Sequence, residues 1–319
     1  MNREMAQGPD RTVMAAFFAS VFIGGTNFVA VKFSNAELPP LFGAAVRFAA
    51  AALIFLAIMR VMGMKLPRGH ALAGAAIYGV LNFGVFYALL YYALTGVSAG
   101  TTSVVLSSAP LMTLVLAVAH RQERFTLRGI IGGLLAVAGI AVMSYRNLGG
   151  DLPLLPLLAT IGGALVVAES TVIVKAFPKS HPITTNAFGM VVGAAGLFAA
   201  SAIFGESWIV PQQGRTWLVL GYLTIVGSVG LFGLFLYVIK RWTASSSVYA
   251  VTLMPFVAVT LGALLAHERI TSEVLAGGAL VILGVYVGAL SERLAAHRAQ
   301  RQPPEPVPIP EPAALAPPC

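Results

Sequence analysis

Charged residues are scarce in this chain, because Asp, Glu, Lys and Arg together make up 10% of its 319 residues. A soluble domain usually carries about a quarter of such residues. Hydrophobic residues make up 58%, and the mean hydropathy is +0.85. A water-facing surface cannot be built from so few charges. We therefore expect lipid to surround most of this chain, with no room left for a soluble catalytic domain.

Cysteine is almost absent, and the single Cys319 follows a Pro-rich stretch. The sequence therefore predicts neither a disulfide framework nor a zinc site. It also lacks a Gly-rich loop with Gly-Lys-Ser/Thr, so ATP is not the evident energy source. The segment 96–100 (Gly-Val-Ser-Ala-Gly) matches the sequence pattern of a hydrolase nucleophile elbow. That motif requires a strand followed by a helix, whereas this segment connects two apolar spans. His267-Glu268 lacks the second His of a zinc motif. We predict no cofactor and no metal.

The sequence instead contains long apolar runs. The length of each run approaches the roughly 20 residues that a helix needs to cross a bilayer. We expect an all-α integral membrane protein with ten transmembrane helices. The first twelve residues form a cytoplasmic segment, and residues 291–319 form a disordered Pro-rich cytoplasmic tail. The expected spans are 13–33, 39–59, 71–94, 99–119, 129–145, 152–174, 184–204, 216–239, 245–266 and 273–290.

Basic residues indicate how these spans are oriented. The net charge is +8, and no basic stripe on a folded surface suggests a nucleic-acid partner. With the N-terminus inside, the outside segments hold Lys32, Arg146, Arg215 and Arg269, and Arg47 lies within a span. All other Lys and Arg residues of the 20 then lie inside. The positive-inside rule therefore predicts that both termini are cytoplasmic.

The chain contains an internal repeat. At a shift of 145 residues, segment 99–142 aligns with 244–287 without a gap and with eleven identities. These include Pro110 with Pro255, Glu123-Arg124 with Glu268-Arg269, and the three glycines 132, 133 and 139 with 277, 278 and 284. We divide the chain into a first repeat, 13–145, and a second, 146–290. Because five spans is an odd number, the second repeat is inverted, a construction that secondary transporters use.

Several of these residues resemble a known family. They are the run Gly25-Thr26-Asn27 at the end of the first span, Pro39-Pro40, Arg47-Phe48, Ser98-Ala99, and Pro110 with the Glu-Arg-x-Thr copies. Through these residues, the chain resembles the EamA-type members of the drug/metabolite transporter superfamily. The resemblance covers roughly residues 13–290. The resemblance implies a ten-helix carrier of the bacterial inner membrane. Among such carriers, the aromatic and neutral amino-acid exporters are the most similar.

Two charged residues, Arg47 and Glu169, lie deep inside expected spans, where charge is expensive and usually functional. Arg47 either contacts a solute carboxylate or braces carbonyl groups between helices. Glu169 either couples transport to protons or binds an amino group of a solute. The alternative is that it lies near a bent helix end, where water hydrates it.

Polar and aromatic residues at helical spacing indicate further contacts with a solute, or else hydrogen bonds that join helices. Tyr78, Asn82 and Phe86 form one such stripe. Two prolines, Pro110 and Pro255, lie within spans and are candidate hinges. The full set of candidate substrate contacts is Asn27, Arg47, Tyr78, Asn82, Phe86, Ser103, Glu169, Tyr222 and Tyr249.

These observations predict a secondary transporter that exports small amphipathic metabolites, neutral and aromatic amino acids above all, by alternating access. One alternative is export of cationic or lipophilic drugs that uses Glu169. Two others, from different classes, are a membrane-embedded enzyme and a structural membrane protein. Whether the chain is a monomer or a homodimer stays undecided.

Overall fold

The computed structural model describes residues 10–121, 127–145, 153–174, 176–178, 180–241 and 244–287. Every regular element within these ranges is helical, as the composition predicts. The elements are α1 (Arg11–Ser34), α2 (Pro40–Val61), α3 (His70–Tyr78), η2 (Gly79–Val85), α4 (Phe86–Gly96), α5 (Ala99–Leu106), α6 (Ala109–Ala119), α7 (Leu127–Tyr145), α8 (Leu154–Val174), α9 (Pro182–Ile203), α10 (Gly214–Gly221), η4 (Tyr222–Gly230), α11 (Leu231–Arg241), α12 (Ala244–Leu265) and α13 (Ser272–Val285).

Each expected span coincides with one helix or with two or three helices that follow one another closely in the chain. Seven of these segments, within the described residues, are long and apolar enough to cross a membrane. Three further apolar helices of 10–17 residues, 127–143, 250–265 and 272–285, lie at the expected fifth, ninth and tenth spans. The count of ten crossings and the cytoplasmic termini stay predictions, and the tail 291–319 lies outside the described residues.

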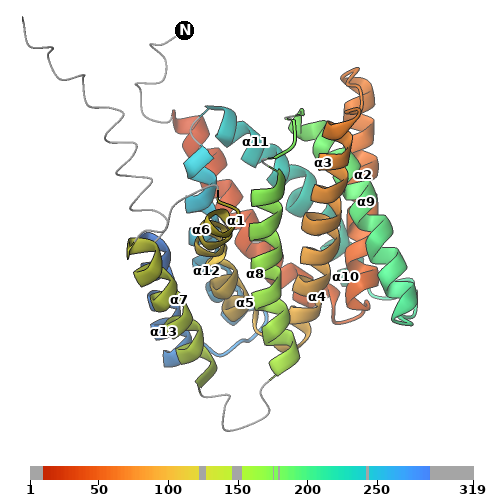
Figure 1. Ribbon diagram of the computed structural model, residues 1–319. Coiled ribbons are helices and arrows are strands. Elements are labelled where there is room, and N and C mark those ends of the chain that lie inside the picture. The colour runs from red at the N-terminus through yellow and green to blue at the C-terminus, as the bar shows by residue number, and fades with distance from the viewer. Residues whose placement is uncertain are drawn as a thin grey trace, which may run out of the picture.

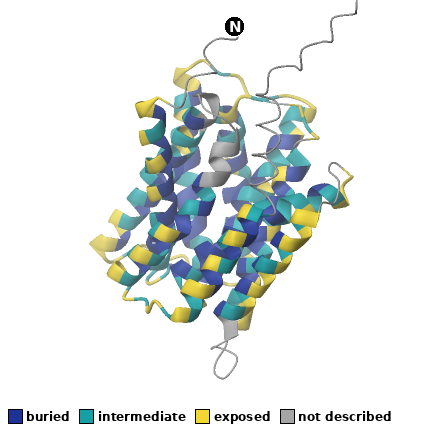
Figure 2. Ribbon diagram, turned by 90° about the vertical axis from the view of Figure 1, so that its left-hand side faces the viewer, coloured by how far each residue is buried: buried dark blue, intermediate teal, exposed yellow. Residues whose placement is uncertain are grey.

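The surface of the bundle is apolar. Figure 2 shows the exposed residues on the outer faces of the helices and the buried ones along the interior. Large side chains such as Phe18 (56% exposed), Leu53 (68%) and Leu134 (66%) lie on these outer faces. Apolar exposure on this scale would drive aggregation in water, whereas lipid solvates it.

The packing of the helices follows the internal repeat. The equivalent helices α2 and α9 pack together at one edge of the bundle, and α7 and α13 pack together at the opposite edge (Figure 1). Between these edges, α1 packs against α11 and α12. Its counterpart α8 packs against α4, α5 and α6, the equivalents of those helices. Such reciprocal contacts are those that a two-fold axis between the repeats produces.

Glycines let α7 and α13 approach until their backbones meet. A Cβ atom added at Gly139 would lie 2.5 Å from the Gly277 carbonyl oxygen, and one added at Gly284 would lie 2.5 Å from the Gly132 carbonyl oxygen. Neither position accepts a side chain unless the helices separate. These are glycines that the two repeats share, so the repeated sequence pattern reflects close helix packing.

Both repeats contain a π-helical segment at the same place. The third expected span is α3, η2 and α4 in succession, and the eighth is α10, η4 and α11. With the shift of 145 residues, η2 falls on residues 224–230, within η4. A π-helix leaves backbone groups outside the regular α-helical pattern and occurs often at functional sites. The candidate residues Tyr78, Asn82 and Tyr222 lie at or inside these segments.

The two prolines expected as hinges differ in the structure. The fourth expected span is interrupted by a turn at Ser107-Ser108, and Pro110 lies in the first turn of α6. This position suits proline, because the first turn of a helix has no partner for the missing N–H group. Pro255 instead lies inside the uninterrupted helix α12. A symmetric pair of breaks, one in each repeat, is therefore absent from the described structure.

Candidate functional site

Arg47 lies at the centre of a buried polar cluster. Its side chain on α2 is fully buried. The Nε atom donates to the Ser228 hydroxyl at 2.9 Å, Nη2 donates to the Gly227 carbonyl oxygen at 3.0 Å, and Nη1 donates to the Tyr91 hydroxyl at 3.4 Å. The guanidinium carbon also lies 5.0 Å from the ring centroid of Phe48. Arg47 thus connects α2 of the first repeat to η4 of the second.

The acceptor Gly227 lies in the π-helical segment η4 and accepts more than one bond. A second donor, Asn27 Nδ2 on α1, lies 2.9 Å from the same carbonyl oxygen. In addition, the Ser228 hydroxyl donates to the Leu223 carbonyl oxygen five residues back, at 2.9 Å. A Cβ atom at Gly227 would overlap the side-chain amide of Asn27, so any larger residue there would displace that amide. Three helices therefore meet at one carbonyl group.

Two polar atoms near this cluster lack a hydrogen-bond partner among the described residues. One is Asn27 Oδ1, and the other is the hydroxyl oxygen of Tyr222, the first residue of η4. Buried polar groups are normally paired, because an unpaired group in a low-dielectric interior is destabilising. These two atoms are therefore candidates for contact with a polar solute.

Aromatic rings cover one side of the cluster. Phe48 and Tyr87 lie 4.4 Å apart between ring centroids, and Phe83, which is fully buried, lies 5.3 Å from Phe48. Phe83 also contacts Tyr78 and Phe232, each at 5.4 Å. The arrangement combines a cation, hydrogen-bonding groups and aromatic walls, which is the composition that an amphipathic solute needs.

The expected stripe on the third span is only partly brought together. Asn82 Nδ2 donates to the Tyr78 hydroxyl at 3.2 Å. Tyr78 lies against α9 at Gly189, while Phe86 faces α8 at Gly163. The π-helical segment between Tyr78 and Phe86 changes the helical period that the stripe assumed.

The remaining candidate residues lie apart from the Arg47 cluster. The Ser103 hydroxyl donates within its own helix, to the Gly100 carbonyl oxygen at 2.7 Å. Glu169 Oε1 on α8 pairs with His120 Nε2 at 3.1 Å, next to the end of α6. The side chain of Tyr249 lies outside the described residues.

Three acidic residues join connections and helix starts at one end of the bundle. We call this the outer end, because it contains the connections 35–39, 97–98, 204–213 and 266–271, which the Lys and Arg count places outside. Glu268 Oε1 accepts from Lys32 Nζ at 2.6 Å and from the Ala99 backbone N–H at 2.9 Å. Its Oε2 accepts from the Gly100 N–H at 3.4 Å. One carboxylate thus joins α1, the start of α5 and the α12–α13 connection.

Two more glutamates act in the same way. Glu206 accepts from the backbone N–H groups of Leu41 and Phe42 at the start of α2, at 3.0 and 2.8 Å. Glu37 accepts from the start of α10, from the backbone N–H groups of Gln212 and Gln213 and from the Thr216 hydroxyl. The Thr216 bond is the main cause that lowers the pKa of the Glu37 carboxyl below its ordinary value of 4.5. Carboxylates at helix N-termini satisfy free N–H groups and complement the helix dipole.

Sequence reasoning missed several of these residues. Ser228, Gly227 and Tyr91 gave no signal, because a lone serine, glycine or tyrosine in an apolar span is ordinary. The three glutamates carried a usable signal, since each lies in a predicted outside connection between two apolar spans. Which helix each one caps depends on tertiary packing, and the sequence does not contain that information.

Comparison with known proteins adds a decisive observation. The EamA-like transporter family matches residues 11–145 and again residues 154–289. The chain belongs to this family. The two matches correspond to the two repeats, so the two-repeat architecture and the resemblance read from the sequence are confirmed. The protein is a membrane transporter and a multi-pass protein of the bacterial inner membrane, with a small-molecule substrate and a lipid environment.

Relatives with curated names agree with this assignment. An uncharacterized transporter of Archaeoglobus fulgidus is 29% identical over 84% of this chain and 95% of its own length. The uncharacterized inner membrane transporter YedA of Escherichia coli is 29% identical over 86% and 90%. A probable amino-acid metabolite efflux pump of the same species is 28% identical over 86% and 93%. The family and these names indicate a transporter rather than an enzyme.

The fold also matches a solved structure. A crystal structure of 19% sequence identity superposes with a TM-score of 0.61, covering 89% of this chain and 98% of the other. At this identity the likeness supports the fold alone.

Proposed function

We propose that this EamA-family transporter exports small amphipathic metabolites, above all neutral and aromatic amino acids, by alternating access. The observation that carries the proposal is the buried cluster around Arg47, with its unpaired Asn27 and Tyr222 oxygens and its aromatic wall. The relative named as an amino-acid metabolite efflux pump supports the substrate class.

The cluster offers complementary groups to each part of such a solute. A guanidinium carries five N–H donors, and the Arg47 bonds described above occupy three of them. A carboxylate near Arg47 would accept from the others. The Asn27 Oδ1 and Tyr222 oxygens would accept from an ammonium group, and Phe48 with Tyr87 would pack against an apolar or aromatic side chain.

Contacts between connections at the outer end support the alternating-access part of the proposal. The Glu37, Glu206 and Glu268 contacts join four connections into one surface at that end. In the proposed cycle, a solute in the cluster leaves outward when those contacts separate. Export then requires the outer contacts to open while the inner end closes around the same site.

The first test is counterflow in proteoliposomes. Vesicles are loaded with one unlabelled amino acid from a panel, and trace labelled amino acid is added outside. Label that accumulates only with a matching internal solute establishes carrier activity and identifies the substrate class. If no amino acid produces accumulation in sealed vesicles that contain folded protein, the amino-acid assignment is wrong.

A second test addresses the site itself. Tyr222→Phe removes a buried hydroxyl whose oxygen has no hydrogen-bond partner of good geometry among the described residues, so we expect folding to lose little. If this hydroxyl contacts the solute, we expect the KM for counterflow to rise roughly tenfold, with unchanged thermal stability. Tyr92→Phe, on the exposed face of α4, is the matched control and should change neither quantity. An unchanged KM in Tyr222→Phe would remove Tyr222 from the site.

One observation favours a second candidate function, export of cationic drugs. Glu169 pairs with His120 through Oε1, while its Oε2 atom is buried and has no partner among the described residues. A cationic solute near the end of α6 would find a carboxylate there. Glu169→Gln should then abolish efflux of a cationic dye such as ethidium and leave amino-acid counterflow largely intact. Unchanged dye efflux would exclude this candidate.

A further inference from the structure

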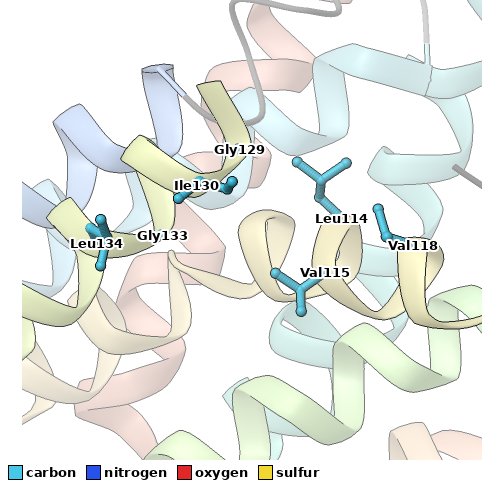
Figure 3. Close-up of a pocket in the computed structure, with 7 residues that line it drawn as sticks. All are labelled: Leu114, Val115, Val118, Gly129, Ile130, Gly133 and Leu134. Carbon is cyan, nitrogen blue, oxygen red and sulfur yellow. The ribbon is translucent and has the colours of Figure 1, made fainter. Parts of the chain in front are cut away.

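A cavity lies between α6 and α7, apart from the Arg47 cluster. Its volume is about 230 Å³, and it is lined by Leu114, Val115, Val118, Gly129, Ile130, Gly133 and Leu134. Figure 3 shows the α6 side chains and the α7 residues on facing sides of this space. Val115, Ile130 and Leu134 are exposed on the outer surface, so the cavity is a groove that opens toward the surrounding lipid.

The lining excludes the transported solute as the occupant. Every residue of the groove is aliphatic or glycine, and none offers a side-chain hydrogen-bond donor or acceptor. The carboxylate and ammonium groups of an amino acid would lose their hydration there without replacement. A hydrocarbon chain loses nothing on entering, because its polar end remains outside the groove.

Glycine creates the space on the α7 side. A Cβ atom added at Gly133 would meet nothing within 4 Å, so a larger side chain would fit and would fill the groove. The position is therefore open in the folded protein, in contrast to Gly139 two turns later, where the backbone of α13 blocks any side chain.

Positive charge flanks one end of the groove. Arg121 follows the end of α6, three residues after Val118, and Arg128 precedes Gly129 at the start of α7. Both arginines are exposed, and neither forms an ion pair within the part of the chain that the structure describes. The Lys and Arg count places this end in the cytoplasm. Anionic lipids are concentrated in the cytoplasmic leaflet, and basic pockets between membrane helices bind their headgroups.

We propose that this groove binds one anionic phospholipid of the inner leaflet, with an acyl chain between α6 and α7 and its phosphate at Arg121 and Arg128. The bound lipid fills the gap between the α7–α13 pair and the rest of the bundle. This site goes beyond the proposed transport function, and its test does not depend on transport activity.

Native mass spectrometry of the purified full chain tests the proposal. The protein is delipidated in detergent and titrated separately with dioleoyl phosphatidylglycerol and dioleoyl phosphatidylcholine, which share their acyl chains. We expect one tightly retained phosphatidylglycerol. Arg121→Gln combined with Arg128→Gln should weaken its affinity roughly twenty-five-fold, from about a fivefold contribution of each basic residue. Gly133→Leu should abolish retention of this lipid.

Matched controls separate the groove from the general surface. Gly196→Leu places the same side chain on α9, where an added Cβ also meets nothing within 4 Å. Arg60→Gln combined with Arg68→Gln removes two exposed charges beside the α2–α3 connection. Both control variants should retain phosphatidylglycerol as the unchanged protein does.

Three results would overturn the proposal. The first is equal retention of phosphatidylcholine and phosphatidylglycerol. The second is retention that survives Gly133→Leu while the variant remains folded by circular dichroism. The third is a dimer of the chain that Gly133→Leu dissociates, with no retained lipid, because a second copy would then be the occupant of the groove.

Discussion

Arg47 has no exposed surface, yet it carries a charge within a membrane-spanning helix. A charge in this position is expensive unless its donors are satisfied. Its contacts with Ser228, Gly227 and Tyr91 supply that compensation. Of the two interpretations that the sequence allowed, the geometry favours the brace between helices. Contact with a solute carboxylate remains part of the proposed function.

Substitution of Arg47 should therefore affect stability as well as transport. Arg47→Gln leaves the Ser228 and Gly227 acceptors without this donor, and we expect a loss of about 3 kcal/mol in the free energy of unfolding. Arg47→Lys keeps the charge but cannot reach three acceptors in a planar fork, so we expect a loss of about 1–2 kcal/mol. Unfolding by SDS in mixed micelles measures both values.

Arg60→Gln is the control, because Arg60 is exposed at the end of α2. Equal stability of Arg47→Gln and Arg60→Gln would show that Arg47 does not brace the helices.

Glu37 gives the outer end a pH dependence. Because its pKa is lowered in the folded protein, Glu37 contributes stability above its ordinary value of 4.5. That contribution is lost as the pH falls through the lowered pKa of the folded state. Glu37→Gln should lower the unfolding midpoint relative to the unchanged protein at pH 7, and the difference should shrink as the pH is lowered below 4.5. A difference that stays constant over this range would contradict the assignment.

The starts of three helices, α2, α5 and α10, are capped in the same way. Each receives a carboxylate from a different part of the chain: Glu206, Glu268 and Glu37. A local cap is also present at α5, where the Ser98 hydroxyl accepts from the Thr101 N–H group at 3.0 Å. The remote carboxylates add what a local cap cannot, because they hold one helix start against another connection.

Neutralising Glu268 should therefore open the outer end. Glu268→Gln removes the ion pair with Lys32 and weakens the cap on α5. We expect the outward-open population to rise roughly tenfold. A cysteine at Ser103, which is 2% exposed, reports this opening through its labelling rate with an impermeant maleimide added outside. The background carries Cys319→Ser, which removes the natural cysteine.

The adjacent, exposed Arg269 provides the control for this experiment, because Arg269→Gln removes a charge without touching the cap. Equal labelling rates in Glu268→Gln and the unchanged protein would mean that the carboxylate does not hold the outer end closed.

The helices themselves were largely predictable, whereas their distortions were not. Apolar runs placed each span within a few residues of the observed helix. The sequence did not predict the π-helical segments. Residues 79–85 share no identity with residues 224–230 at the shift of 145 that aligns the repeats elsewhere. The break before Pro110 and the unbroken helix at Pro255 were likewise not predicted, because the two prolines occupy equivalent positions in the repeat.

For the molecule as a whole, the sequence predicted the repeat and the family but only part of the site. Arg47 and Asn27 were identified, and they share the Gly227 carbonyl oxygen as acceptor. Glu169 and Ser103 were grouped with them, although their described contacts lie elsewhere. Helical periodicity identifies a face on one helix. It does not determine which faces of different helices meet.

The orientation of the molecule gives one further prediction. If both termini are cytoplasmic, green fluorescent protein fused after Cys319 should fluoresce, because the fusion does not leave the cytoplasm. Alkaline phosphatase fused after Gly205, in the connection that follows α9, should be active because that connection is outside. Activity of the phosphatase after Cys319 would contradict the even number of crossings.

The contacts between the repeats are related by symmetry, but their chemistry differs. The helices α2 and α9 both begin with proline and contain 22 residues, which places Gly189 at the position equivalent to Arg47. Arg47 meets η4 through a charged side chain, while Gly189 meets η2 at Gly79, where a Cβ atom would lie 2.5 Å from the Gly189 carbonyl oxygen. Separating the first contact exposes a guanidinium and its acceptors, whereas separating the second exposes backbone and the rings of Tyr78 and Phe83 but no charge. The inward-facing and outward-facing forms of this carrier should therefore differ in free energy. Consequently the same solute should show different half-saturation concentrations on the two sides of the membrane, even when no external energy source drives transport.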